Sequence, residues 1–193
     1  MKKHSLKELI KSDYLRISNN LNWYKYIKIY FLNPRGKYIF WLRAYQVLIN
    51  KNNTHYPHIL YLFITKIIYK HYSLLIGMQI PARTKIGKGF YFAHYYGIVI
   101  NENAIIGDNV TIYNEVTIGY ARSHKTGKEG APIIGNGVVI FPGARIIGPI
   151  TVGNYSIIAP NAVVINDVPS ESVVGGIPAK IISQNGSYGY FNN

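Results

Sequence analysis

The feature that most constrains this chain is a six-residue repeat in its C-terminal two-thirds. Aliphatic residues return at every sixth position, and a second small or apolar residue follows each of them four positions later. The anchors run without a break through Ile134, Ile140, Ile146, Val152, Ile158 and Val164. An earlier run has the same spacing at Ile100, Ile106, Ile112 and Ile118, and Ile86, Phe92 and Ile98 precede it two residues out of phase. Self-similarity of this kind indicates a solenoid, in which each repeat stacks on its neighbours.

A period of six matches neither the 3.6 residues of a helix nor the two of an isolated strand, so it requires short strands joined by turns. The turn residues are present in Gly107-Asp108-Asn109, Gly135-Asn136-Gly137 and Gly153-Asn154. Glycine and asparagine accept the positive φ that such turns need. Three repeats per coil would close a triangular prism with the anchors stacked inside, a parallel β-helix. An ordinary sandwich would not preserve the spacing over six consecutive repeats.

The repeat is interrupted once, because Ile118 and Ile134 are 16 residues apart. The inserted segment is polar, charged and rich in glycine, so we expect residues 119–133 to leave the prism as a loop.

Residues 1–76 show helical patterning instead, with breaks at Asn33–Gly36 and Asn50–Pro57. This predicts three helices over 5–31, 35–50 and 57–75. The expected organisation is therefore a small α-helical region at 1–76, a β-helix at 77–183 and a tail at 184–193.

The formal charge of +13 is unevenly distributed. Residues 1–80 contain 13 Lys and Arg against 2 acids, whereas residues 81–193 contain 8 against 6. A basic, aromatic helical region fits packing on the prism, association with an anionic membrane surface, or contact with an acidic glycan. No nucleic-acid-binding motif accompanies the charge, so nucleic acid is not expected as a partner. The start of the chain lacks the apolar segment of a signal peptide, and there is no cysteine, which together predict a cytoplasmic protein.

Specific motifs accompany the repeat: Ile86-Gly87-Lys88-Gly89, His94, Gly97-Ile98-Val99, Val116–Gly119 and Gly175–Lys180. With them the chain resembles the left-handed β-helix acyltransferases of the hexapeptide-repeat family, in the serine acetyltransferase-like branch. The resemblance covers roughly residues 77–183. It implies a mainly β fold, a homotrimer with active sites between subunits, and acetyl-CoA as the acetyl donor.

The resemblance also assigns a base. Of the six histidines, only His94 lies where the family keeps its catalytic imidazole, and neutral imidazole suits proton removal near neutral pH. Gln79 occupies the position of the acid that orients this histidine in the family. The implied reaction is direct transfer of acetyl to a hydroxyl, without a covalent enzyme intermediate.

The family's coenzyme A groove implies a further set of residues on this chain. These are Gly119, Ala121, Pro142, Arg145, Ala159, Pro160 and Lys180, with Arg145 and Lys180 as phosphate partners. No metal is expected, since a zinc site on this prism would need three histidine ligands and only His94 and His124 lie in or beside the repeat.

The acceptor is predicted from positions at which this sequence departs from the serine acetyltransferase pattern. Serine acetyltransferases place an acid before the catalytic histidine and an Arg-His pair in the loop, whereas this chain has Ala93, Gly130 and Ala131 at the matching positions. A buried zwitterion without partners is costly, so the expected acceptor is a sugar hydroxyl of a capsular or lipopolysaccharide chain or its precursor. The expected substrate-binding residues are Phe92, Tyr95, Tyr96, Tyr113, Asn114, Tyr120 and His124. The alternatives are serine O-acetylation, or a non-catalytic hexapeptide scaffold or glycan-binding subunit.

Overall fold

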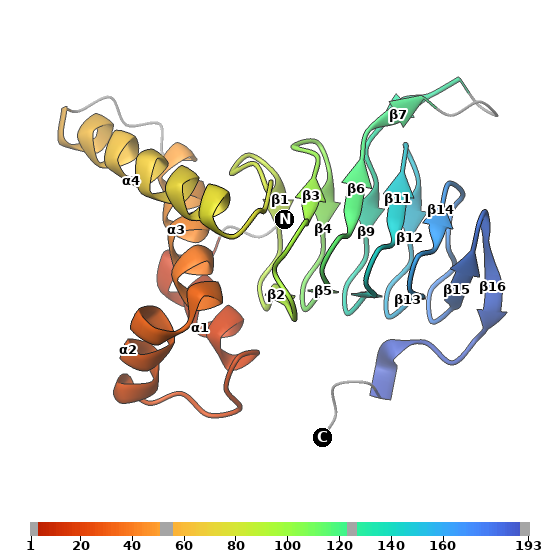
Figure 1. The fold of residues 1–193 in the computed structure, drawn as a ribbon, viewed down its shortest axis with the longest axis horizontal. Helices are drawn as coiled ribbons and strands as arrows, with labels where there is room; N and C mark the ends of the chain where they lie inside the picture. The colour runs from red at the N-terminus through yellow and green to blue at the C-terminus, as the bar shows by residue number, and fades with distance from the viewer. Residues whose placement is uncertain (1–3, 51–55, 123–126, 190–193) are drawn as a thin grey trace.

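The computed structural model describes residues 4–50, 56–122 and 127–189. Four helices are followed by a stack of short strands, and the chain winds through this stack coil by coil (Figure 1). The helices lie at the N-terminal end of the stack, and β16 lies at the other end.

Three parallel sheets form the faces of the prism. The first consists of β1 (Lys85–Ile86), β4 (Ile105–Ile106), β9 (Ile133–Ile134) and β12 (Thr151–Val152). The second contains β2 (Tyr91–Phe92), β5 (Thr111–Ile112), β10 (Val139–Ile140), β13 (Ile157–Ile158) and β15 (Val173–Gly176), with β16 (Ala179–Ser183) antiparallel at its edge. The third consists of β3 (Val99–Ile100), β6 (Thr117–Gly119), β11 (Arg145–Ile147) and β14 (Val163–Val164). Each strand therefore pairs with the strand one coil away, which is the arrangement of a parallel β-helix.

The strand register between successive coils confirms that the predicted anchor residues stack inside the prism. In the second sheet Phe92 pairs with Ile112, Ile112 with Ile140, and Ile140 with Ile158, and all four side chains are fully buried. The stacked anchors of the other two sheets are buried in the same way. One assignment was wrong: Ile100, not Ile98, pairs with Ile118, so Ile98 fills the second inward position of its coil.

The turns repeat as regularly as the strands. Asp108 Oδ1 accepts from the Lys88 N–H at 2.9 Å, and Asn136 Oδ1 accepts from the Asp108 N–H at 2.8 Å. Asn154 Oδ1 then accepts from the Asn136 N–H at 2.7 Å. This ladder pairs backbone donors that the short strands leave without partners.

The inserted segment forms a hairpin on the prism. β7 (Ala121–Arg122) pairs antiparallel with β8 (Glu129–Gly130), and the hairpin projects away from the coils (Figure 1).

The helical region contains four helices instead of the three predicted. They are α1 (Leu6–Leu15), α2 (Trp23–Leu32), α3 (Pro34–Ile49) and α4 (Tyr56–Leu75). The predicted helix 5–31 was wrong because α1 ends at Leu15, with Arg16 as its C-cap, and Asn22 starts α2 by accepting the Lys25 N–H on its side chain. Polar capping of this kind stabilises a helix start by about 1 kcal/mol.

A buried ion pair joins the helices to the first coil. Asp13 on α1 accepts from Arg43 Nε on α3 at 2.8 Å, and both side chains are at most 1% exposed. Arg43 also donates to the Ile86 carbonyl at 2.9 Å, while Asp13 accepts the Phe90 N–H at 2.8 Å. Burial raises the pKa of Asp13, and the Arg43 charge opposes that rise. The same contacts cover the edge of the first coil, which would otherwise expose unpaired strand groups.

The core is continuous across this junction. Tyr38 on α3 is fully buried and packs edge-on against Phe92 of the prism, with ring centroids 5.8 Å apart. The domain boundaries proposed at 76/77 and 183/184 stay a prediction. In the described part of the chain, no helix is both long and apolar enough to cross a membrane.

Candidate active site

His94 lies in a turn that breaks the regular spacing. Phe92 ends β2 and Ile100 ends β3, so eight residues separate these anchors instead of six. The two extra residues fall within the turn 93–98, where Gly97 has φ +69°. Anchors on both sides keep their register, and the imidazole of His94 is exposed at the prism surface. The longer turn thus displays a base on a surface that the regular repeat would make smooth.

The coils place other candidate residues in line with this turn. The N–H groups of Ala93, Tyr113, Phe141 and Ala159 each donate to the anchor one coil further along, at 2.8–3.0 Å. These four residues therefore stack along one corner, and each is followed by another candidate: His94, Asn114, Pro142 or Pro160. We call this edge, between the second and third sheets, the His94 corner.

Aromatic rings continue along the His94 corner. The His94 ring lies 6.2 Å from the Tyr113 ring, and Tyr113 stacks on Phe141 at 5.0 Å with an angle of 15° between the planes. Phe141 was not among the site residues predicted from the sequence. Its position one coil beyond Tyr113 was the signal that would have placed it at this corner.

The remaining coenzyme candidates lie off this corner. Gly119 pairs with Ile147 and accepts the Gly148 N–H at 3.0 Å, and Ala121 follows it at the base of the hairpin. Arg145 donates to the Gly143 carbonyl at 3.0 Å and to the Glu115 carbonyl. Lys180 is exposed on β16. Within one chain the coenzyme candidates are therefore distributed over two corners of the prism and the terminal strand β16.

The aromatic substrate candidates have different environments. Phe92 is fully buried between Tyr38 and Phe90, so its predicted contact with a substrate was wrong. Tyr95 packs partly against the core, whereas Tyr96 is 68% exposed. Tyr120 donates to Glu129 Oε2 at 3.2 Å, and this bond raises the pKa of the phenol. His124 lies outside the described residues.

Gln79 lies at the edge of the third sheet. Its backbone bridges Val99, donating to Ile98 and accepting from Ile100, both at 2.8 Å. Between these two described residues, the structure contains no hydrogen bond from the Gln79 side chain to His94, so the orienting role of Gln79 stays a prediction.

Arg35 is the site residue that the sequence did not indicate. It lies in the first turn of α3, and its guanidinium donates to the carbonyl of Ala93, the residue directly before His94. The same guanidinium lies 4.7 Å from the centroid of the Tyr91 ring. Because 58 residues separate the two partners, no local pattern could have shown this contact.

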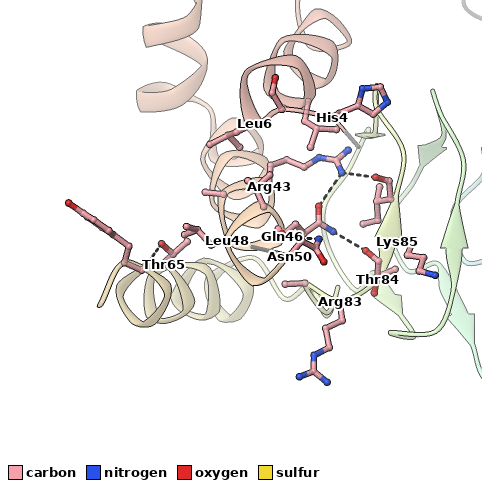
Figure 2. A pocket seen from close by; sticks show the side chains of 17 residues that line it. His4, Leu6, Arg43, Gln46, Leu48, Asn50, Thr65, Arg83, Thr84 and Lys85 are labelled. Atoms are coloured by element: carbon pink, nitrogen blue, oxygen red, sulfur yellow. Dashed lines mark hydrogen bonds between the residues drawn. The ribbon is translucent and has the colours of Figure 1, made fainter. Parts of the chain in front are cut away.

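A large cavity lies elsewhere, between α1, α3, α4 and the first coil (Figure 2). Its volume is about 1180 Å³, and its walls include Arg43, Gln46, Arg83 and Thr84. Gln46 donates across it to the Thr84 carbonyl at 3.0 Å. None of the predicted catalytic, coenzyme or substrate residues lines this cavity. Over residues 4–50, 56–122 and 127–189, no cluster of three or more His, Asp or Glu suits a metal ion.

Comparison with known proteins defines the class of this repeat. Residues 131–166 match the family described as "Bacterial transferase hexapeptide (six repeats)". The match is confined to these residues, which form part of the stacked sheets of the parallel β-helix.

The similar proteins are serine acetyltransferases. The chain is 40% identical over 127 residues to a serine acetyltransferase from Bacillus pumilus (strain SAFR-032). The alignment covers 64% of this chain and 56% of that protein. It resembles the crystal structure of a serine acetyltransferase from Brucella abortus strain S19, with 26% identity, a TM-score of 0.73, and coverage of 94% of this chain and 70% of the other. A serine acetyltransferase in complex with CoA gives 26% identity and a TM-score of 0.72 over 92% of this chain and 70% of that chain. The chain spans about half the length of the curated relatives that it matches.

These relatives overturn the predicted acceptor. The assignment to a capsular or other surface polysaccharide was wrong, because the similar proteins are serine acetyltransferases. The prediction compared charges at three aligned positions only. It did not account for charges from other elements, such as the Arg35 guanidinium that reaches Ala93.

Proposed function

We propose that this protein is an acetyl-CoA-dependent serine O-acetyltransferase with His94 as its general base. The observation that carries the proposal is the exposed imidazole on the lengthened turn of a transferase hexapeptide prism. Serine is proposed as the acceptor and acetyl-CoA as the donor because the similar proteins are serine acetyltransferases, one of them solved in complex with CoA.

In the proposed reaction, the His94 imidazole takes the proton of the serine hydroxyl as the oxygen attacks the acetyl carbonyl carbon. The tetrahedral oxyanion accepts hydrogen bonds from backbone N–H groups and then collapses, breaking the C–S bond. The CoA thiolate leaves and takes up the proton that His94 removed from serine, so the products are O-acetylserine and CoA. General base catalysis of this kind contributes roughly 10²- to 10⁴-fold to the rate.

The proposed assembly is a trimer of left-handed prisms with active sites between subunits. Exposed apolar side chains on the prism faces, including Val99, Ile133 and Ile165, supply surface for such contacts. Pro142, Ala159 and Pro160 extend the His94 corner along the prism, where a coenzyme would lie beside the base. Arg145 and Lys180 are proposed to face its phosphates, and Gln79 to orient His94.

Turnover of free L-serine tests the function directly. We expect purified protein with acetyl-CoA and L-serine to release CoA thiol, and to form O-acetylserine detectable by mass spectrometry. Ethanolamine and 3-hydroxypropionate are matched acceptors that lack the carboxylate and the ammonium group, respectively. Both should react at least tenfold more slowly than serine if both charges are recognised.

Two outcomes would contradict the proposal. Equal turnover of all three hydroxyl compounds would show that the site does not recognise an amino acid. Coenzyme A binding without transfer to serine would instead favour a non-catalytic hexapeptide protein.

Arg35 gives a further prediction for the same reaction. Replacing it by methionine keeps an apolar stem over Tyr91 but removes the donor to the Ala93 carbonyl. A hydrogen bond from a charged group contributes about 1.5–3 kcal/mol, so we expect kcat to fall about tenfold or more as the His94 turn loosens. The KM for acetyl-CoA should change little, since Arg35 contacts none of the proposed coenzyme residues.

The control for this variant is Arg16→Met. Arg16 also bridges from the helical region to the prism, donating to Thr111 Oγ1 at 2.7 Å and to the Asn109 carbonyl at 3.2 Å, but it does not contact Ala93. Arg35→Lys, which retains the charge, should recover part of the rate. If both methionine variants lose kcat equally, the effect comes from docking of the helices, not from positioning of His94.

A further inference from the structure

The outward face of α4 is apolar and has no partner within the described chain. Thr65 and Tyr69 face inward and are buried, and α4 packs against α3 on that side. Opposite them lie Ile59, Leu60, Phe63, Ile67 and Leu74, with exposed fractions from 45% to 83%. Their spacing of three, four and seven residues gathers them on one face of the helix. At about 1.5 Å per residue, the stripe from Ile59 to Leu74 is about 22 Å long.

Helix α2 has a second face of the same kind. Its one buried residue, Ile29, lies on the side that packs against α3. Trp23, Phe31 and Leu32 are 61–76% exposed, and Tyr24 and Ile27 are about half exposed. Both α2 and α4 lie in the helical region, beyond the first coil of the prism (Figure 1). A soluble surface rarely exposes this much contiguous apolar area without a binding role.

The charges around these faces are all of one sign. Lys25 and Lys28 lie on α2, and Lys66 and Lys70 lie on α4. No Asp or Glu occurs between Asp13 and Glu102, whereas 12 Lys and Arg occur in that interval. By the same spacing, Lys70 lies within the α4 stripe and Lys66 lies at its edge, so the charges that accompany these apolar faces are cations.

We propose that the outward faces of α2 and α4 bind the surface of an anionic lipid bilayer. A helix with one apolar face and flanking lysines lies in the interface, with its apolar side chains among the acyl chains and its ammonium groups near lipid phosphates. The aromatic side chains Trp23 and Tyr24 suit the headgroup level.

The charge distribution favours a bilayer over a second copy of the same faces. Pairing α4 with α4, or α2 with α2, would bring lysines together with no carboxylate in residues 14–101 to neutralise them. An anionic bilayer supplies both an apolar phase and a compensating negative charge. This inference does not depend on the proposed serine chemistry.

The test is sedimentation of the full chain with sucrose-loaded vesicles. We expect binding to vesicles of phosphatidylcholine and phosphatidylglycerol, and little binding to phosphatidylcholine alone. Raising the salt concentration should weaken the binding steeply, because counterions screen the lysine contacts.

Two pairs of substitutions separate the contribution of the lysine charges to vesicle binding from that of the apolar side chains. Lys66→Gln with Lys70→Gln should lower the partition coefficient about 25-fold, since each lysine near an anionic surface contributes about fivefold. Phe63→Ser with Ile67→Ser should lower it at least tenfold through the lost apolar burial. The matched controls are Lys88→Gln on the prism and Leu15→Ser at the end of α1, which change an exposed lysine and an exposed leucine away from both faces.

Equal binding to neutral and anionic vesicles, or no binding to either, would overturn the proposal. So would a change of oligomeric state, seen by analytical ultracentrifugation, in the Phe63 and Ile67 variant without lipid, because it would show that a second copy covers α4. Turnover of soluble serine by the same variants is an independent readout. It should be retained whether or not the vesicles bind, so a failure of the serine chemistry cannot be mistaken for a failure of lipid binding.

Discussion

Replacing His94 by alanine is expected to lower kcat for acetyl transfer to serine by roughly 10²- to 10⁴-fold. The variant removes the group proposed to accept the hydroxyl proton, and no other histidine in the described residues lies at the His94 corner. Stability should be nearly unchanged, because the side chain is exposed and the turn keeps its backbone bonds. Initial rates of CoA release at saturating acetyl-CoA, with a thermal melt on the same preparation, measure both effects.

The matched control is His71→Ala. His71 is exposed on α4 and is not one of the proposed site residues. It should retain the parent rate. A His94 variant with near-parent turnover would require another base, and the proposed mechanism would fail even if serine is the acceptor.

The second large effect is on stability. Asp13→Asn should lower the free energy of unfolding by about 3–5 kcal/mol, since it leaves the buried Arg43 charge without its counter-ion. The amide oxygen of asparagine can still accept the Phe90 N–H, but its NH₂ group replaces the oxygen that accepts from Arg43 Nε, so two donors face each other there. Urea unfolding followed by far-UV circular dichroism, at one fixed protein concentration, measures this loss.

A double variant distinguishes the unpaired charge from simple loss of packing. Asp13→Leu with Arg43→Met removes both charges, and it should recover much of the stability that Asp13→Asn loses. For comparison, Glu129→Gln breaks the exposed pair with Arg122, whose atoms are 4.0 Å apart, and should change stability little. If Asp13→Asn is as mild as Glu129→Gln, the buried pair does not hold the junction.

The prism could be predicted from sequence because its anchors determine it locally. A buried position at every sixth residue leaves one way to stack the coils, and the pairing of Ile112 with Ile140 and of Ile118 with Ile146 follows from that spacing. The hairpin at residues 121–130 falls within the interruption of the repeat. His94 was identified by resemblance, and the lengthened turn that displays it is visible as the phase change before Ile100.

The helical region was less predictable because its packing depends on distant residues. Between α1 and α2, Ser18, Asn19, Asn20 and Asn22 favour caps and turns over a helix interior, so the sequence contained a local signal for this break that the predicted helix 5–31 overlooked. Arg35 and Arg43 are two cations among 21, and nothing local indicates that one reaches Ala93 while the other is buried beside Asp13. The acceptor was predicted incorrectly for the same reason, since charges near a site on a prism can come from elements far away in the sequence.

The two-residue lengthening before Ile100 separates the proposed chemistry from the stability of the stack. Phe92 pairs with Ile112 and Ile100 pairs with Ile118, so the stacked anchors carry the stability, while the exposed positions His94 and Tyr96 can change without altering the core. New acceptor specificities could therefore arise by changing this one turn without rebuilding a core. The helical region restricts that freedom at one atom, the Ala93 carbonyl bound by Arg35, so altered turns and altered α3 residues are expected to change together.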